Sequence, residues 1–369
     1  MFVAWRDLRA ARGRFALLAA VVALVTLLVG SLTGLTAGLA AQNVSAVLGL
    51  DADAVVLARP AGSSGSTSGA LTFADSSVSS AQQSAWASAA GVTGAWPLGV
   101  SQTRATRQSS SGTASTQSAA VAVLGTDPGL TATTPASPAT VVLSTPAAEA
   151  LKARTGETVE LGGQRFTVAQ VSGDGWYSHT PVVWTTFLDW QQLSRATGGS
   201  GEASALLVRG DLDGDQRAAL DTRTGTTATT LLGSLGAIGA FRSEVGSLGL
   251  IIGLLLVVSA LVVGAFFTVW TLQRTADVAV LKALGASTRS LVVDALGQGT
   301  AVLVGGVAAG TAGVVAIGLA AGTAVPFVLS PLTALAPSLL VVVLGLVGVL
   351  VALRAIVSAN PLTALGSIR

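Results

Sequence analysis

The sequence predicts a membrane protein with four transmembrane α-helices and a mixed α/β extracytoplasmic domain inserted between helices 1 and 2. The chain of 369 residues is 51% hydrophobic and only 10% charged, with a mean hydropathy of +0.70, whereas soluble domains carry about 25% charged residues. Charged residues are also unevenly spread, since none occurs in residues 15–50, 245–273 or 295–353. A bilayer-spanning helix needs roughly 20 apolar residues. The first two gaps therefore hold one helix each, and the third holds two.

The uncharged stretches place the transmembrane helices at residues 15–40, 246–272, 292–322 and 337–358. A cleaved signal peptide would explain the first stretch, because four arginines precede it. Its apolar run is longer than the roughly 7–15 residues of a signal peptide, so we expect a membrane anchor that is retained.

Glycines recur in two of these helices. Gly30, Gly34 and Gly38 are spaced every four positions in the first helix, and the third helix contains glycines at 305, 306, 310 and 313. Small residues at such spacing let two helices approach closely. The spacing therefore predicts helix contacts, although a composition rich in glycine remains an alternative explanation.

The basic residues give the chain a direction. Lys and Arg gather in short cytoplasmic loops, and here they precede the first helix, separate the second from the third, and follow the fourth. We therefore expect a multi-pass protein of a bacterial cytoplasmic membrane with both termini inside. The cytoplasmic parts would be an amphipathic helix at 1–14, a loop at 273–291 and a tail at 359–369. An uncharged external loop is expected at 323–336.

The region 41–245 reads as an extracytoplasmic α/β domain, because short apolar runs alternate with Gly, Pro, Ser and Asp. The expected strands are 54–57, 120–124, 140–143, 165–171, 181–184 and 205–208, and the expected helices are 81–89, 146–153, 186–194 and 215–221. Two stretches rich in Ser, Gly and Thr, 61–69 and 108–117, are expected to be loops.

Several kinds of chemistry have no support in the sequence. The chain has no G-x-x-x-x-G-K-[ST] motif for a nucleotide phosphate. It has one histidine and no cysteine, which excludes most metal and nucleophile arrangements. Its basic residues form no patch interleaved with aromatic residues, so nucleic acid is not an expected partner. We expect no catalytic residues, no metal and no cofactor of its own.

The most specific segment follows the second helix, at residues 273–287. It reads QRTADVAVLKALGAS, with apolar Val278, Leu281 and Leu284 at helical spacing and Gly285 suited to end the helix. Such a helix could dock a soluble partner on the cytoplasmic face. It could also simply anchor the loop to the membrane surface.

This segment resembles the signature of FtsX-like (MacB-type) ABC transporter permeases, and the chain's ends (WRDLR at residues 5–9, NPLTAL at 360–365) are similar to those of the family. Asp277-Val278 departs mildly from the usual Glu-Ile. The resemblance implies a non-enzymatic permease that pairs with a second copy, lies among membrane lipid, and is driven by a separate ABC ATPase holding ATP-Mg. The residues implied to couple to that ATPase are Trp5, Arg9, Arg274, Asp277, Lys282, Leu284 and Gly285.

Residues 175–184 and Asp189-Trp190 look like HrtB-type haem exporter permeases, which implies an HrtA-type ATPase partner and haem as the exported substrate. Haem iron takes His, Tyr, Met or Cys as axial ligand, which favours Tyr177 and His179. Both would share one side if they lay on a strand. Arg242 and Glu244 could meet a haem propionate or the iron. Alternatively, Tyr177 packs, His179 hydrogen-bonds within a structural turn, and Arg242 and Glu244 form a simple interfacial ion pair.

Two other functions remain open from the sequence. The same machine could export another amphiphile, such as a lipid, a lipopeptide or an antibiotic. The chain could also transport nothing and relay ATPase strokes to an extracytoplasmic partner such as a cell-wall hydrolase.

Overall fold

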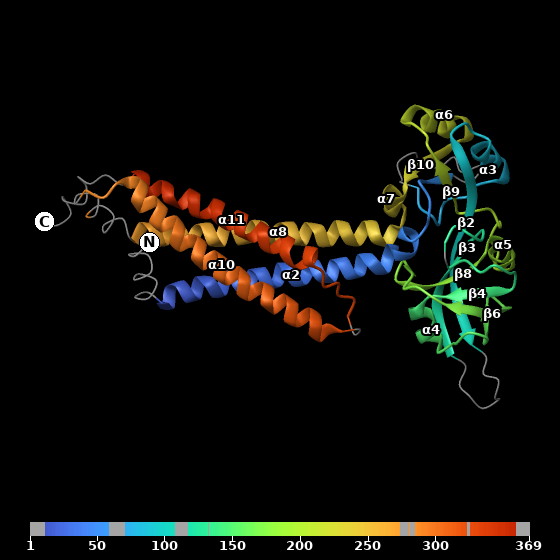
Figure 1. The fold of residues 1–369 in the computed structure, drawn as a ribbon, viewed down its shortest axis with the longest axis horizontal. Helices are drawn as coiled ribbons and strands as arrows, with labels where there is room; N and C mark the ends of the chain where they lie inside the picture. The colour runs from blue at the N-terminus through green and yellow to red at the C-terminus, as the bar shows by residue number, and fades with distance from the viewer. Residues whose placement is uncertain are drawn as a thin grey trace. The chain divides into compact units, whose positions relative to one another are not determined.

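The structure is a computed structural model that describes residues 12–58, 71–107, 117–131, 133–273, 280, 285–322 and 325–358. The chain divides into a helical unit, Met1–Gly38 with Gly246–Arg369, and a β-rich unit, Leu39–Val245 (Figure 1). Within the described residues, four helices are long and apolar enough to cross a membrane. The β-rich unit lies between the first and second of them in the sequence. The predicted fold class is therefore confirmed.

The long helices are α2 (Arg12–Leu48), α8 (Gly239–Gln273), α10 (Thr288–Ala321) and α11 (Pro331–Ser358). All four begin before the spans expected from hydropathy, and α2 and α8 also end after them, because a helix does not end where its apolar stretch ends. The predicted loop at 323–336 is wrong in its second half, since α11 begins at Pro331. Ser330 and Thr333 cap that start reciprocally, each backbone N–H donating to the other's hydroxyl at 2.9 and 3.1 Å. Proline is well suited to a first helical position, where its missing N–H costs nothing.

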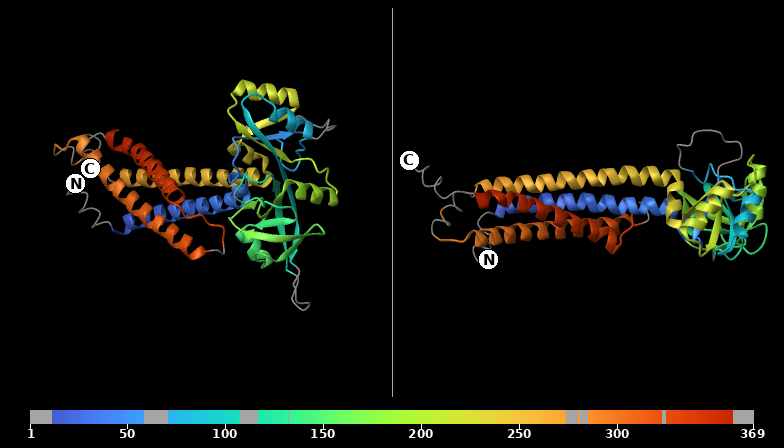
Figure 2. Two further views of the ribbon diagram at one scale, coloured as in Figure 1. Left: turned by 45° about the vertical axis from the view of Figure 1, so that its right-hand side comes forward. Right: turned by 90° about the horizontal axis from the view of Figure 1, so that it is seen from above.

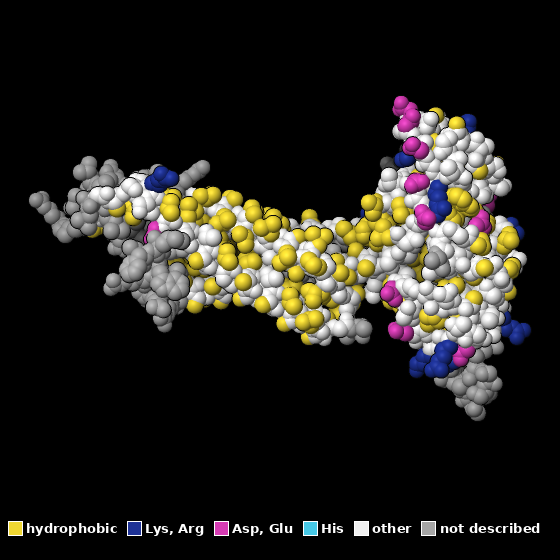
Figure 3. All heavy atoms as spheres, in the orientation of Figure 1, with side chains coloured by type: hydrophobic (Ala, Val, Ile, Leu, Met, Phe, Trp, Pro, Cys, Tyr) yellow, Lys and Arg dark blue, Asp and Glu magenta, His cyan; other side chains and the backbone are white. Residues whose placement is uncertain are grey.

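The helical unit is packed around apolar and aromatic side chains from all four helices. Phe15 of α2 lies edge-on to Trp270 of α8 at 5.9 Å between ring centroids, and Phe267 lies edge-on to Trp270 at 6.0 Å. Both views in Figure 2 show the four helices running alongside one another within this unit. Figure 3 shows hydrophobic side chains covering the visible face of the helices, whereas charged side chains gather over the β-rich unit.

Glycines bring α2 and α10 together. A Cβ on Gly306 would lie 2.7 Å from the Ala19 carbonyl oxygen, and a Cβ on Gly310 would lie 2.6 Å from the Thr26 Cβ. On the α2 side, Gly30 faces Val314 at 2.6 Å, Gly34 faces the Phe327 ring, and Gly38 faces the Pro326 carbonyl. The predicted close packing of the first helix is confirmed. Gly305 differs from its neighbour, because a Cβ there would meet nothing within 4 Å.

The β-rich unit is built on one sheet with the strand order β10-β1-β9-β2-β3-β8-β4-β6-β5. Its strands are β1 (Ala54–Ala58), β2 (Val92–Arg107), β3 (Gln117–Thr126), β4 (Thr140–Leu143), β5 (Thr158–Leu161), β6 (Gln164–Val171), β7 (Trp176–Tyr177), β8 (Thr180–Thr186), β9 (Ala205–Gly210) and β10 (Thr226–Thr230). The far end of β2 also pairs with β5, from Ala105 to Arg107. Strands β2, β3, β8, β4, β6 and β5 therefore form a closed ring, and β1, β9 and β10 extend from it.

Short helices cover this sheet. They are α3 (Ser80–Ala87), α4 (Thr145–Leu151), α5 (Phe187–Ala196), α6 (Gly214–Thr224) and α7 (Leu231–Ser234), followed by a 3-10 turn, η1 (Leu235–Ala237). Helices α4 and α5 pack on the ring, while Trp86 of α3 and Leu220 of α6 pack on β1 and β9. A third cluster joins the sheet to the last turns of α2, through Val44, Val47 and their neighbours. Figure 1 shows α3 and α6 near β9 and β10, and α4 near β4 and β6.

The expected strands and helices of this region each coincide with an observed element to within a few residues. Four strands were not expected, namely β2, β5, β7 and β10. The stretches expected as loops, 61–69 and 108–117, lie outside the described residues except for Gln117, which begins β3.

Candidate functional site

The segment containing Tyr177 and His179 is a tight β-hairpin in the β-rich unit. Strands β7 and β8 pair antiparallel, with Tyr177 opposite Thr180. Ser178 and His179 between them have φ of 47° and 61°, and two consecutive positive φ values define the tightest class of hairpin turn. Tyr177 and His179 would share one side only if both lay on a strand, and this condition is not met, because His179 lies in the turn.

The hairpin turn is held against α2. The backbone N–H groups of Ser178 and His179 donate to the carbonyl oxygens of Asn43 and Gln42 at 3.1 and 3.0 Å. A positive φ is costly for residues other than glycine. The two hydrogen bonds to α2 stabilise Ser178 and His179 in this conformation. The turn thereby sets where the His179 ring lies.

His179, Glu244 and Asn43 form a polar cluster, here named the His179 cluster. His179 Nε2 lies 2.7 Å from Glu244 Oε1, and Asn43 Nδ2 donates to Glu244 Oε2 at 3.0 Å. Asn43 is fully buried, and each of the other two side chains is 33% exposed. Helices α2 and α8 and the β7–β8 turn each contribute one residue. All three residues belong to the β-rich unit.

The proton positions in this cluster follow from its donors and acceptors. The Asn43 amide nitrogen lies near three atoms: the Leu39 carbonyl oxygen at 3.1 Å, Glu244 Oε2 at 3.0 Å and His179 Nε2 at 3.1 Å. Its two hydrogens go to the two oxygens, and the Glu244 carboxylate can only accept from His179, at the shorter distance of 2.7 Å. His179 Nε2 must then carry the hydrogen that is donated to Glu244. In the neutral ring, Nδ1 keeps its lone pair, and Nδ1 has no hydrogen-bond partner among the described residues. The ring is thus oriented by a carboxylate with its other nitrogen available to accept.

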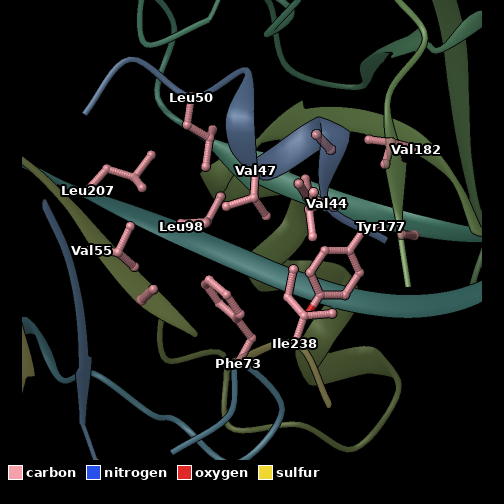
Figure 4. Packing of buried hydrophobic residues seen from close by; sticks show 14 of the residues in the cluster. Val44, Val47, Leu50, Val55, Phe73, Leu98, Tyr177, Val182, Leu207 and Ile238 are labelled. Atoms are coloured by element: carbon pink, nitrogen blue, oxygen red, sulfur yellow. The ribbon is translucent and has the colours of Figure 1, made fainter. Parts of the chain in front are cut away.

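Tyr177 belongs to the hydrophobic core instead. It is 7% exposed and lies edge-on to Phe73 at 6.1 Å between ring centroids. Figure 4 shows its ring between Phe73, Ile238 and Val44. Burial raises the pKa of the Tyr177 phenol well above its ordinary value, so the phenolate that would ligate iron is disfavoured. The sequence left two interpretations of Tyr177 and His179, haem ligands or structural residues. The geometry matches the second, because Tyr177 packs in the core and His179 is hydrogen-bonded in a turn.

The sequence prediction included Glu244 but paired it with Arg242. Arg242 is exposed on α8 and has no side-chain partner in the described part of the chain, while Glu244 contacts His179. Asn43 was missed. The available signal was an amide side chain near the end of an otherwise apolar, uncharged run, a place where polar side chains are costly and therefore informative.

Most of the predicted coupling surface lies outside the described residues, including Trp5, Arg9, Arg274, Asp277, Lys282 and Leu284. Gly285 is described and has φ of 94°, a conformation that favours glycine. Ser287 then caps α10, accepting from the Ser290 N–H at 3.2 Å. The turn that leads into α10 thus has a glycine at its positive-φ position and a serine at the helix N-cap.

The described residues thus form four membrane-type helices, with a β-rich unit inserted in the sequence between the first and the second. Residues 249–361 match the family "FtsX-like permease C-terminal". This part of the chain is therefore an FtsX-like permease domain, which confirms the resemblance found at residues 273–287.

Individual relatives point the same way. Two curated proteins described as the hemin transport system permease protein HrtB are similar to this chain. The protein from Staphylococcus haemolyticus is 21% identical over 215 residues (58% of this chain and 60% of that protein), and the one from Staphylococcus epidermidis is 20% identical over 201 residues (54% and 55%). The chain thus spans little more than half the length of these relatives.

Two solved structures show some similarity to this chain. The periplasmic region of MacB from Actinobacillus actinomycetemcomitans has a TM-score of 0.35 at 13% identity, covering 52% of this chain and 94% of that one. The extracellular domain of YknZ from Gram-positive bacteria has a TM-score of 0.33 at 14% identity, covering 48% and 97%.

Proposed function

We propose that this protein is the permease subunit of an ABC-type efflux system, working as a homodimer with a separate ATPase by mechanical transmission. The observation that carries the proposal is the FtsX-like permease match over residues 249–361, together with a sequence that has no P-loop. The energy source must then lie in another subunit. In this proposal both termini and residues 273–291 lie in the cytoplasm and the β-rich unit lies outside, an orientation that the distribution of basic residues supports.

The ATPase should dock on the segment that follows α8. Reversing the charge there, with Arg274→Glu and Lys282→Glu together, should reduce co-purification of the ATPase at least tenfold while membrane insertion stays intact. The reason is that surface charges of complementary sign steer and hold transient partners. Glu149→Lys on α4, in the β-rich unit, is the matched control and should leave co-purification unchanged. Full recovery of the ATPase with the double variant would contradict the docking site.

A second copy has an apolar surface available to it on α8. Leu250, Leu254, Val257 and Leu261 are each more than 60% exposed, and their spacing puts them on one face of the helix. Lipid covers such a face in a monomer. In the proposed dimer the same face would give a partner helix a charge-free surface to pack against.

Haem is the cargo that the His179 cluster supports best. Histidines that ligate metals almost always donate their other ring N–H to a carboxylate or carbonyl, and His179 donates to Glu244. Its Nδ1 lone pair would then be the iron ligand. His179 is therefore a better candidate than Tyr177, whose phenol is buried. The relatives described as hemin transport permeases favour the same cargo.

Haem binding is tested by titrating hemin into the purified permease–ATPase complex and following the Soret band. His179→Ala should abolish the bound spectrum, and Glu244→Gln should weaken binding by about tenfold, as changes to a ligand's carboxylate partner do. Tyr177→Phe and the exposed α8 variant Ser243→Ala should bind as the unaltered protein does. An unchanged Soret band with His179→Ala would remove His179 as the ligand.

Growth on a hemin gradient, with and without this gene and its ATPase, separates the remaining functions. Loss of tolerance supports haem export. Equal tolerance would favour another amphiphile or a non-transporting transducer, and changed sensitivity to cell-wall hydrolysis would single out the transducer.

A further inference from the structure

The helical unit contains a short irregular segment directly before α11, residues 325–330, here named the strap. It has no regular secondary structure and reads VPFVLS, without a charged residue. Val325, Val328 and Leu329 are 37–44% exposed, so three of its apolar side chains lie on the protein surface. A connection that lay in water would be expected to carry polar residues at such positions.

The strap lies directly on α2. The Val328 backbone N–H donates to the Gly34 carbonyl oxygen at 3.1 Å. A Cβ on Gly38 would overlap the Pro326 carbonyl and would lie 2.9 Å from the Phe327 nitrogen. Only glycine, which has no Cβ, lets two backbones come this close. The contact therefore depends on two of the three regularly spaced glycines of α2.

The Phe327 ring stands between α2 and α10. A Cβ on Gly34 of α2 would overlap the ring, and a Cβ on Gly318 of α10 would lie 2.9 Å from its Cε1 atom. One helical turn earlier on both helices, Gly30 and Val314 touch directly, because a Cβ on Gly30 would lie 2.6 Å from a Val314 methyl carbon. The ring thus fills the seam between α2 and α10 one turn beyond that contact.

Several polar backbone groups of the strap are bonded within the protein. Pro326 has no N–H, and the Phe327 N–H donates to the carbonyl oxygen two residues before it at 2.8 Å. The Ser330 N–H donates to the Thr333 hydroxyl at 2.9 Å, and this hydroxyl donates to the Val328 carbonyl oxygen at 2.9 Å. Hydrocarbon supplies no such partners, so irregular backbone at membrane depth needs them from protein. The bonding of the strap suits a segment that lies within a bilayer.

We propose that the strap lies among acyl chains in the outer leaflet, in the orientation proposed above, and that the Phe327 ring closes the seam between α2 and α10 to lipid. Gly34 lies inside the uncharged stretch 15–50, about 9 Å before the end of the expected span at roughly 1.5 Å per residue. Exposed Leu332 and Leu339 continue the apolar surface of the strap along α11. Removing the ring would leave an opening at the depth of the acyl chains. The proposal needs neither the ATPase nor a particular cargo.

Electron paramagnetic resonance on the full chain in nanodiscs tests the position of the strap. The chain has no native cysteine, so a single introduced one carries the spin label. A label on Val328→Cys should collide with a water-soluble nickel chelate about tenfold less often than one on Glu149→Cys, because polar solutes avoid hydrocarbon. Glu149 is exposed on α4, and Leu339→Cys on α11 is the membrane control. Equal nickel collisions at Val328→Cys and Glu149→Cys would place the strap in water and overturn the proposal.

Native mass spectrometry with palmitoyl-oleoyl-phosphatidylglycerol tests Phe327 as the closing group, by counting the lipids that each chain retains. Phe327→Ala should retain about one lipid more than the unaltered protein, since close packing favours filling the vacated space with an acyl chain. Phe327→Leu, a milder change, should give an intermediate count. Leu332→Ala removes an exposed side chain and is the control with an unchanged count.

An unchanged lipid count in Phe327→Ala would overturn the closing role, even where Val328→Cys is shielded from nickel. Both measurements use the chain without its ATPase and without cargo. A failure of the proposed transport function would therefore leave their results unaffected.

Discussion

A Gly306→Leu variant should lose about 1–3 kcal/mol of stability, while Gly305→Leu, one position away, should stay within about 0.5 kcal/mol of the unaltered protein. A Cβ on Gly306 would lie 2.7 Å from the Ala19 carbonyl oxygen and 2.8 Å from the Val22 Cβ. Backbone on α2 cannot yield as a flexible side chain would, so the two helices must separate. Leucine at Gly305 enters open space and improves helix propensity.

Thermal unfolding of the detergent-solubilised protein measures this pair of variants. The expected fall in Tm for Gly306→Leu is roughly 1–4 °C, from an unfolding entropy of about 2.1 cal/mol/K per residue. Because the two glycines are adjacent in one helix, insertion and expression should be equal for both. A matching loss of stability at Gly305 would show that α10 tolerates no leucine anywhere, and would remove the contact with α2 as the explanation.

Trp190→Ala should destabilise the β-rich unit by about 3–5 kcal/mol. Trp190 is 3% exposed and lies on Gly99 of β2 and Gly125 of β3, which are direct partners across the two strands. A Cβ on either glycine would overlap the Trp190 side chain. The indole N–H also donates to the Ser101 hydroxyl at 3.0 Å. Removing the ring leaves a cavity and an unpaired hydroxyl together.

Limited proteolysis and far-ultraviolet circular dichroism on the full chain report the effect of Trp190→Ala, with β structure expected to melt at lower temperature. Leu188→Ala is the control, because Leu188 lies on the same helix and is 63% exposed. Equal melting temperatures for the two variants would mean that the packing of the Trp190 indole on Gly99 and Gly125 does not stabilise the β-rich unit.

The same residues explain what Asp189-Trp190 contributes. In the sequence this pair helped to indicate an HrtB-type permease. In the structure Asp189 accepts from the Thr186 hydroxyl at 2.8 Å and from the Ala139 N–H at 3.1 Å. Trp190 packs on Gly99 and Gly125. Both residues therefore hold the fold of this chain's inserted domain together.

The helices and most strands could be predicted because each carries a local signal. Uncharged apolar runs mark the long helices, and short runs bounded by turn residues mark strands such as β4 and β9. β2 escaped because Pro97 and two glycines interrupt its pattern, and β10 because Thr226–Thr230 contains no large apolar residue. Their pairing is decided by distant strands, which no local pattern reports.

The site was predictable only in part, for a similar reason. His179 and Glu244 stood out as rare residue types. The interaction that joins them spans 65 positions, and the third member, Asn43, lies 136 positions from His179. His179 itself lies in a turn, and that turn was not predictable because its two positive-φ positions are occupied by Ser178 and His179 and not by glycine.

Strand β2 has a mechanical consequence. Its 16 residues are hydrogen-bonded to β9 at one end, to β5 at the other, and to β3 along most of their length. Slipping by a single residue would turn every inward side chain outward, so the strand behaves as a stiff beam. Strand β2 therefore connects the two halves of the β-rich unit rigidly. A displacement of either half should displace the other, so the β-rich unit should move as one rigid body.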